Sequence, residues 1–125
     1  MKIISVLVVD DETEFREAVI RRLDRRGIAV QGAASGRDAL DLLARQPMDV
    51  VLLDLKMPDI DGMQTLRRIK ELYPKTVVIL FTGHASLESA QEGLGLGAAD
   101  YLLKPSTADE IMVKIQECLR QTPAA

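Results

Sequence analysis

The chain has 125 residues, which suits one domain and leaves little room for a second. Apolar residues make up 47% and charged residues 28%, an ordinary globular composition that argues against disorder. The net charge of −3 provides no strongly basic surface, so neither direct contact with nucleic acid nor binding to an anionic membrane is expected.

Short apolar runs alternate with amphipathic stretches along the chain. Near-continuous apolar runs of this length predict strands that are buried on both faces of a parallel sheet. A weaker run with more alternation predicts an edge strand. The strong runs are residues 3–9, 50–53, 77–81 and 101–103, and the weaker run is residues 28–33.

A helix is predicted after each strand, because apolar residues recur there three or four positions apart. The first helix contains Phe15 and Leu23 and ends at Gly27, and the third ends before Pro74. The fourth is the weakest, because a glycine inside a helix costs about 1 kcal/mol relative to alanine. The remaining predicted helical stretches are centred on residues 39–43, 86–94 and 111–119.

Five strand–helix units in sequence predict an α/β fold with a doubly wound parallel sheet of five strands and right-handed connections. We expect one domain over residues 1–121. Residues 122–125 are expected to form a C-terminal tail or the start of a linker.

The single cysteine, Cys118, and the single histidine, His84, exclude several kinds of site. An internal disulfide needs a second cysteine, and one cysteine with one histidine cannot build a zinc site. A hydrolase with a histidine base would have to use His84, which has no nucleophile elbow or oxyanion motif around it. The apolar run at residues 3–9 is too short to cross a bilayer and lacks a cleavage site. These observations favour a cytoplasmic protein.

Polar side chains follow four of the predicted strands. In an open α/β sheet, ligands bind beyond the carboxyl ends of the strands, so these side chains are expected to converge. They are Asp10 and Asp11 after the first run, Asp54 after the third, Thr82 after the fourth and Lys104 after the fifth.

Neighbouring carboxylates repel one another unless a cation lies between them, and oxygen ligands favour Mg²⁺ or Mn²⁺. A metal held by aspartates, together with a lysine and a hydroxyl, is typical of a phosphoryl site in which one carboxylate is the nucleophile.

The chain resembles the receiver domain of two-component response regulators over roughly residues 4–120. The resemblance implies a flavodoxin-like sheet with strand order 2-1-3-4-5. The stretch 82–105 is also similar to receivers of regulators that activate sigma-54. The motifs that carry the resemblance are Asp10-Asp11, Asp54 with Met57-Pro58 and Gly62, Thr82-Gly83, and Tyr101-Leu102-Leu103-Lys104-Pro105.

The resemblance implies that Asp54 accepts a phosphoryl group from a sensor histidine kinase or a phosphotransfer protein in a Mg²⁺-dependent reaction. Asp11 would bind the metal directly, Asp10 largely through water, and Lys56 through its backbone carbonyl. Lys104 would contact the phosphoryl oxygens.

Thr82 would hydrogen-bond to the phosphoryl group and Tyr101 would follow it inward. The peptide bond between Lys104 and Pro105 is expected to be cis, which is accessible because proline follows. The side chains of Lys56 and His84 would border the water that hydrolyses the aspartyl phosphate and so tune its lifetime.

A receiver of this kind is a signalling switch that catalyses its own phosphotransfer and dephosphorylation, and is not a conventional enzyme. The signal would leave through the fourth helix, fifth strand and fifth helix, over residues 83–120, to control an output domain or a partner protein. The resemblance also allows a homodimer through that surface and a role in transcription regulation, with no direct contact between this domain and nucleic acid or membrane.

Three alternatives stay open. A receiver-like module that is never phosphorylated would act only by binding. A phosphatase of the haloacid dehalogenase type also uses an aspartate nucleophile and Mg²⁺, but it needs a second aspartate at the position of Lys56. A flavodoxin needs a Ser/Thr-rich phosphate loop after the first strand, where this chain has the acidic residues 10–12.

Overall fold

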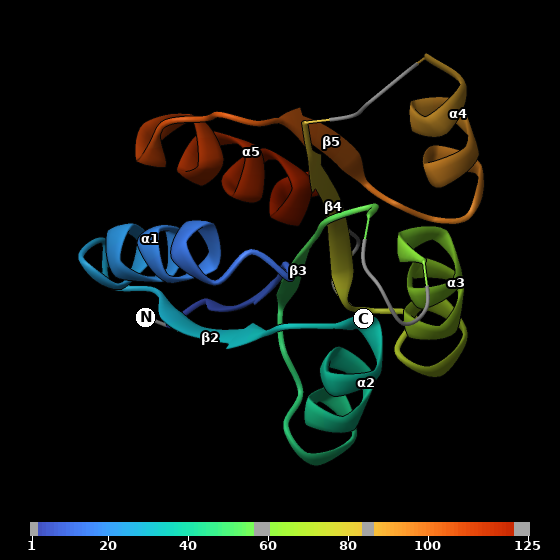
Figure 1. The fold of residues 1–125 in the computed structure, drawn as a ribbon, viewed down its shortest axis with the longest axis horizontal. Helices are drawn as coiled ribbons and strands as arrows, with labels where there is room; N and C mark the ends of the chain where they lie inside the picture. The colour runs from blue at the N-terminus through green and yellow to red at the C-terminus, as the bar shows by residue number, and fades with distance from the viewer. Residues whose placement is uncertain (1–2, 57–60, 84–86, 122–125) are drawn as a thin grey trace.

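The computed structural model describes residues 3–56, 61–83 and 87–121. Strands and helices alternate along the described chain (Figure 1), which confirms the predicted strand–helix units. In chain order they are β1 (Ser5–Val9), α1 (Thr13–Asp24), β2 (Ala29–Ala33), α2 (Gly36–Arg45), β3 (Val50–Leu53), α3 (Gly62–Leu72), β4 (Val77–Thr82), α4 (Leu87–Gly95), β5 (Asp100–Leu103) and α5 (Ala108–Gln121).

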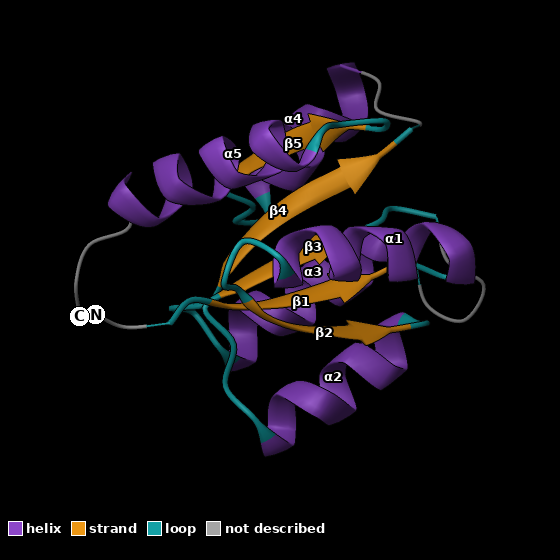
Figure 2. Cartoon of the chain, turned by 90° about the vertical axis from the view of Figure 1, so that its left-hand side faces the viewer, coloured by secondary structure: helices purple, strands orange, loops and turns teal. Residues whose placement is uncertain are grey.

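The strands form one parallel sheet in the order β2-β1-β3-β4-β5, so the predicted doubly wound fold and strand order are confirmed. Residues 28–33 were expected at the edge, and β2 is an edge strand that pairs only with β1 among the described strands. All strand arrows point toward the same edge of the sheet (Figure 2), which places the carboxyl ends of the strands together.

Each face of the sheet is covered by helices, with α1 and α5 on one side and α2, α3 and α4 on the other (Figure 1). Side chains of β1 alternate between the two faces. Val6 and Val8 pack with α1 and α5, whereas Leu7 and Val9 pack with α2 and α3. These four side chains are at most 1% exposed, which explains why residues 6–9 of the strand are all apolar.

Polar side chains begin several helices by accepting hydrogen bonds from free backbone N–H groups. Ser35 Oγ accepts from Asp38 N at 3.1 Å, and Asp61 Oδ1 accepts from Gln64 N at 2.8 Å. Before α5, Thr107 and Glu110 exchange two such bonds as a capping box.

One glycine ends α1, and another lies where α4 packs against the sheet. Gly27, which follows α1, has φ +82°, a conformation that suits glycine, as the sequence predicted. Gly93 packs against the sheet so closely that a Cβ there would lie 2.3 Å from Leu80 Cδ1. The glycine that weakens α4 by propensity therefore also allows α4 to approach the sheet.

None of the helices in the described part of the chain combines the length and apolar character that crossing a bilayer requires.

Candidate functional site

Backbone hydrogen bonds continue beyond the strand ends and hold the polar residues in place. Asp54 N donates to Val9 O at 3.0 Å, and Lys104 N donates to Thr82 O at 3.0 Å. Asp10 N likewise donates to Ala33 O at 3.0 Å. The side chains that follow β1, β3 and β5 are thus mounted on the rigid edge of the sheet.

Asp10, Asp11 and Asp54 form an acidic cluster at this edge. Each offers a carboxylate oxygen, and these oxygens lie within 4.8 Å of one another. Asp10 and Asp54 are buried and Asp11 is exposed. A cavity of about 260 Å³ beside the cluster is lined by Asp11, Glu12, Asp54, Lys56, Gly83 and Lys104.

The donor set fits a hard divalent cation such as Mg²⁺. All three side chains offer oxygen, and Mg²⁺ is typically held by one or two carboxylates with water completing its shell. The Lys104 ammonium contacts Asp10 and Asp54, and Asp11 adds a third carboxylate, so these four side chains together carry an excess of negative charge that a divalent cation can offset.

The ammonium of Lys104 reaches across the cluster. Its Nζ lies 2.5 Å from Asp10 Oδ2 and 3.5 Å from Asp54 Oδ2. Burial alone would lower the pKa of Lys104, but the hydrogen bond to Asp10 and the charges of Asp54 and Asp10 outweigh it and raise that pKa above its ordinary value. Lys104 is therefore a fixed positive charge next to the buried Asp54 carboxylate.

The surroundings of Lys104 favour its charged form, whereas those of Asp54 favour its neutral form. Burial raises its pKa above 3.8, the charge of Lys104 opposes this effect, and the nearby charge of Asp10 adds to it. The Lys56 backbone N–H donates to Asp54 Oδ1 at 3.4 Å. A positive group that approaches Asp54 therefore offsets two effects that disfavour its negative charge, which are the loss of water on burial and the repulsion by Asp10.

Asp10 is held by two further contacts. Its Oδ1 accepts from Glu12 N at 2.9 Å, and its backbone carbonyl accepts from Arg16 Nη1 at 2.8 Å. The sequence did not indicate the contact of Arg16 with the Asp10 carbonyl, nor that of Phe15, whose ring centroid lies 4.3 Å from Lys104 Nζ. Apolar spacing placed Phe15 in the core, and nothing in the pattern distinguished Arg16 from the other arginines of α1.

Gly62 lies against the backbone that directly follows β3. A Cβ at this position would lie 2.5 Å from Leu55 Cα and 2.6 Å from Asp54 O. The Gly62 N–H donates to Leu55 O at 3.0 Å. The start of α3 can approach the backbone that carries Asp54 only because residue 62 has no side chain.

The other expected site residues lie at different depths. Thr82 is fully buried at the end of β4, whereas Lys56 is exposed. Tyr101 is 39% exposed on β5, so its ring is not in the inward position that the switch hypothesis assigns to the phosphorylated state. The Lys104–Pro105 peptide bond is cis. His84 and Met57-Pro58 fall outside the described residues.

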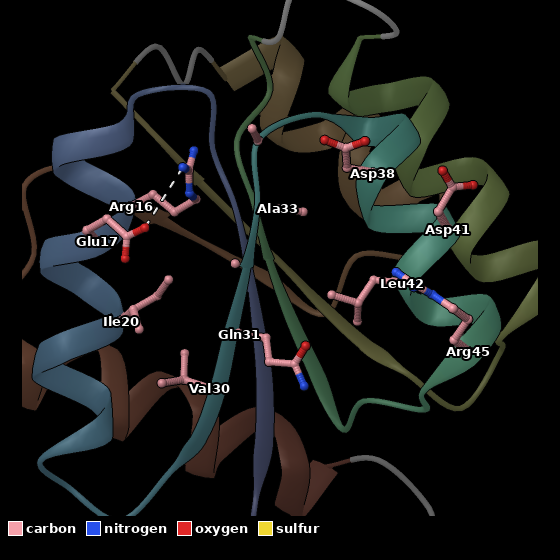
Figure 3. A pocket seen from close by; sticks show the side chains of 12 residues that line it. Arg16, Glu17, Ile20, Val30, Gln31, Ala33, Asp38, Asp41, Leu42 and Arg45 are labelled. Carbon is pink, nitrogen blue, oxygen red and sulfur yellow. Dashed lines mark ion pairs between the residues drawn. The ribbon is translucent and has the colours of Figure 1, made fainter.

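A larger cleft of about 580 Å³ lies away from the acidic cluster, beside β2 and between α1 and α2 (Figure 3). Arg16 and Glu17 come from α1, Asp38 and Arg45 come from α2, and β2 forms the floor. The cleft contains no carboxylate of the acidic cluster. Arg16, which lines it, also reaches the Asp10 carbonyl.

A family model described as the response regulator receiver domain matches residues 6–116 of the chain, from the second residue of β1 into α5. The chain is a response regulator receiver domain. The expected family and fold are thereby confirmed, and the strand-end residues lie at one edge of a receiver sheet.

Relatives and solved structures agree with this assignment. The chain is 36% identical over 119 residues to response regulator MprA of Mycolicibacterium vanbaalenii, and 38% identical over 115 residues to regulatory protein AtoC of Escherichia coli. It covers 52% of the first and 25% of the second, so it spans about half of one curated relative and a quarter of the other. A CheY-like receiver domain protein from Methanospirillum hungatei superposes with a TM-score of 0.92 at 30% identity, over 97% of both chains. The beryllofluoride-activated DrrB receiver domain superposes with a TM-score of 0.85 at 32% identity, over 96% of this chain and all of that receiver domain.

Proposed function

We propose that this receiver is a phosphorylation-activated switch in which Asp54 accepts a phosphoryl group from a histidine kinase or phosphotransfer protein. The observation that carries the proposal is the position of Asp54. Its buried carboxylate lies within the acidic cluster, with the Lys104 ammonium 3.5 Å from Oδ2 and a cavity of about 260 Å³ beside it.

The chemistry is a transfer between two nucleophiles. An Asp54 oxygen forms a bond to phosphorus as the phosphorus–nitrogen bond of a phosphohistidine breaks, and the departing imidazole nitrogen keeps the bonding electrons and takes up a proton. Lys104, already beside Asp54 Oδ2, is placed to neutralise charge on the phosphoryl oxygens.

Mg²⁺, when bound, would neutralise charge on the phosphoryl oxygens and on the acids around it. Asp11, Asp10 and the Lys56 backbone carbonyl are the groups proposed to hold it, with Mn²⁺ as a substitute. The exposed Asp11 carboxylate is accessible from solvent, which suits a direct ligand, whereas Asp10 is already occupied by Lys104.

The proposed output surface is the face of α4, β5 and α5. Three apolar side chains besides Tyr101 are exposed there, Leu94 at 44%, Leu103 at 53% and Val113 at 52%, and a cleft of about 670 Å³ runs between β5 and α5. Thr82 would turn toward the phosphoryl group and Tyr101 would fill the space that Thr82 leaves. An output domain, a partner protein or a second copy of the chain would dock on this face.

The transcriptional role, including the likeness to regulators that activate sigma-54, remains part of this proposal. Relatives include proteins named DNA-binding transcriptional regulator NtrC and transcriptional regulatory protein ZraR, of which the chain covers 24% and 27%.

Amide hydrogen exchange tests the proposal as a whole. Beryllofluoride with Mg²⁺, a mimic of the phosphoryl group, should change exchange around Asp54 and across residues 87–120. The Asp54→Ala variant should show neither change. A response confined to the surroundings of Asp54 would contradict the proposed output surface, and the absence of any response in the wild type would support the reading as a module that only binds.

A further inference from the structure

Phe15 lies between the acidic cluster and the core. The Lys104 Nζ is 4.3 Å from the centroid of the Phe15 ring. The ring also packs against Phe81, with centroids 5.5 Å apart and planes tilted by 53°. Phe15 is half-buried and Phe81 is 2% exposed, so the ring of Phe15 packs against a side chain of the buried core.

An aromatic face attracts an ammonium because the ring carries negative charge above its plane, and the attraction strengthens as water is excluded. The Lys104 side chain is only 13% exposed, so this contact is largely removed from solvent. Among the described residues, the ammonium also contacts Asp10 and Asp54, and more distantly Glu12 at 4.0 Å.

The carboxylate contacts and the ring contact of Lys104 respond differently to a divalent cation. Asp10 and Asp54 belong to the acidic cluster, so a cation bound there competes with Lys104 for their oxygens. The Phe15 ring has no lone pair to offer a hard cation. The cation–π contact of Phe15 with the ammonium is therefore expected to remain when the ion pair with Asp10 weakens.

We propose that Phe15 is a positioning residue for Lys104: its ring keeps the ammonium beside Asp54 when a divalent cation bound in the acidic cluster weakens the pairing of Lys104 with Asp10. The inference rests on the proposed function of Asp54. It assigns to Phe15 a role that depends on the face of its ring, in addition to the space that the side chain fills in the core.

Two substitutions of Phe15 separate the effect of its aromatic face from the effect of the space that its side chain fills. Phe15→Leu fills most of the same space without an aromatic face, and Phe15→Tyr keeps the face. We expect Phe15→Leu to weaken beryllofluoride binding about fivefold in excess Mg²⁺, since a cation–π contact at a partly desolvated site has this magnitude. Phe15→Tyr should bind within a factor of two of the wild type, a margin of roughly 0.4 kcal/mol.

The measurement is a beryllofluoride titration of wild type, Phe15→Leu and Phe15→Tyr, followed by amide chemical shifts, which also verify that each variant is folded. A Mg²⁺ titration without beryllofluoride should give similar affinities for all three proteins. Weakened binding of beryllofluoride in the leucine variant alone supports the inference. Equal affinities in all three proteins, or an equal loss in both variants, overturn it.

A second measurement does not depend on phosphoryl chemistry. Urea unfolding of the metal-free wild type, Phe15→Leu, Lys104→Met and the double variant measures the coupling of the two side chains. If the two side chains interact, the double variant should lose less free energy of unfolding than the two single variants lose together. Losses that simply add up would overturn the contact. If the wild type fails to bind beryllofluoride, the proposed function is refuted, and this cycle still decides whether the ring holds the ammonium.

Discussion

The Lys104 ammonium lies closer to Asp10 than to Asp54, at 2.5 Å from Oδ2 of the first and 3.5 Å from Oδ2 of the second. Lys104, which is proposed to contact the phosphoryl group, is therefore paired mainly with Asp10, which is proposed to help hold the metal. A cation bound by the acidic cluster would weaken that pairing and free the ammonium for the phosphoryl oxygens on Asp54. On the proposed function, metal binding and phosphoryl binding are therefore expected to favour each other.

Divalent cations should stabilise the fold through the exposed carboxylate of Asp11. Mg²⁺ at about a hundred times its dissociation constant should raise the free energy of unfolding by about 2.7 kcal/mol, because it binds only the folded chain. Asp11→Asn should remove most of this gain. Glu12→Gln is the matched control, since Glu12 is also exposed and lines the same cavity. Thermal unfolding with and without Mg²⁺ measures the effect, and an equal gain in both variants would exclude Asp11 as a ligand.

A side chain at residue 62 should displace the backbone that carries Asp54. Gly62→Ala places a Cβ 2.6 Å from Asp54 O, and the neighbouring atoms are backbone that cannot move cheaply. We expect a loss of about 1–3 kcal/mol in the free energy of unfolding, together with slower phosphorylation. In Gly95→Ala the new Cβ has no atom within 4 Å, so that variant should be at least as stable as the wild type. Urea unfolding compares them, and equal stabilities of the two variants would show that Gly62 is not tightly packed.

The raised pKa of Asp54 predicts how stability depends on pH without metal. The folded carboxyl keeps its proton to a higher pH than the unfolded one, whose pKa is near 3.8. As pH rises from below 3.8 through the folded pKa, the folded state binds more protons than the unfolded state, so the contribution of Asp54 to stability falls.

The Asp54→Asn variant lacks this titration. Its stability relative to the wild type should therefore increase across that pH window and stay constant above it, and Mg²⁺ should reduce the difference. Urea unfolding of both proteins between pH 3 and pH 7 is the measurement. A wild type that gains stability relative to the variant as pH rises would contradict the raised pKa.

The lifetime of the phosphorylated state should be long. The Lys56 ammonium offers no acceptor to position a hydrolytic water, and the exposed side chain lines the cavity beside Asp54. Lys56→Asn combined with His84→Glu should speed the loss of the phosphoryl group about tenfold, equivalent to roughly 1.4 kcal/mol of barrier. Decay is followed after rapid removal of the phosphodonor in excess Mg²⁺. An unchanged or slower decay would show that neither side chain controls the water.

Much of the fold could be predicted because burial on both faces leaves strands such as Val50–Leu53 entirely apolar. The strand-end residues could be located as well, because parallel strands share one carboxyl edge. The packing within the site could not. Helical spacing places Phe15 toward the core, but whether its ring meets an aliphatic side chain or the Lys104 ammonium depends on β5, far away in sequence. Likewise, helix propensity makes Gly93 a weakness, while its close approach to Leu80 is a tertiary contact.

The most direct test of the account is intact-mass analysis after incubation with acetyl phosphate and Mg²⁺. The wild type should gain one phosphoryl group, and the gain should disappear with a chelator and in Asp54→Ala. Asp41→Asn, which removes an exposed carboxylate of α2, should be labelled like the wild type. Robust labelling of Asp54→Ala, or labelling of the wild type that ignores the chelator, would contradict the assignment of Asp54 as the metal-dependent phosphoryl acceptor.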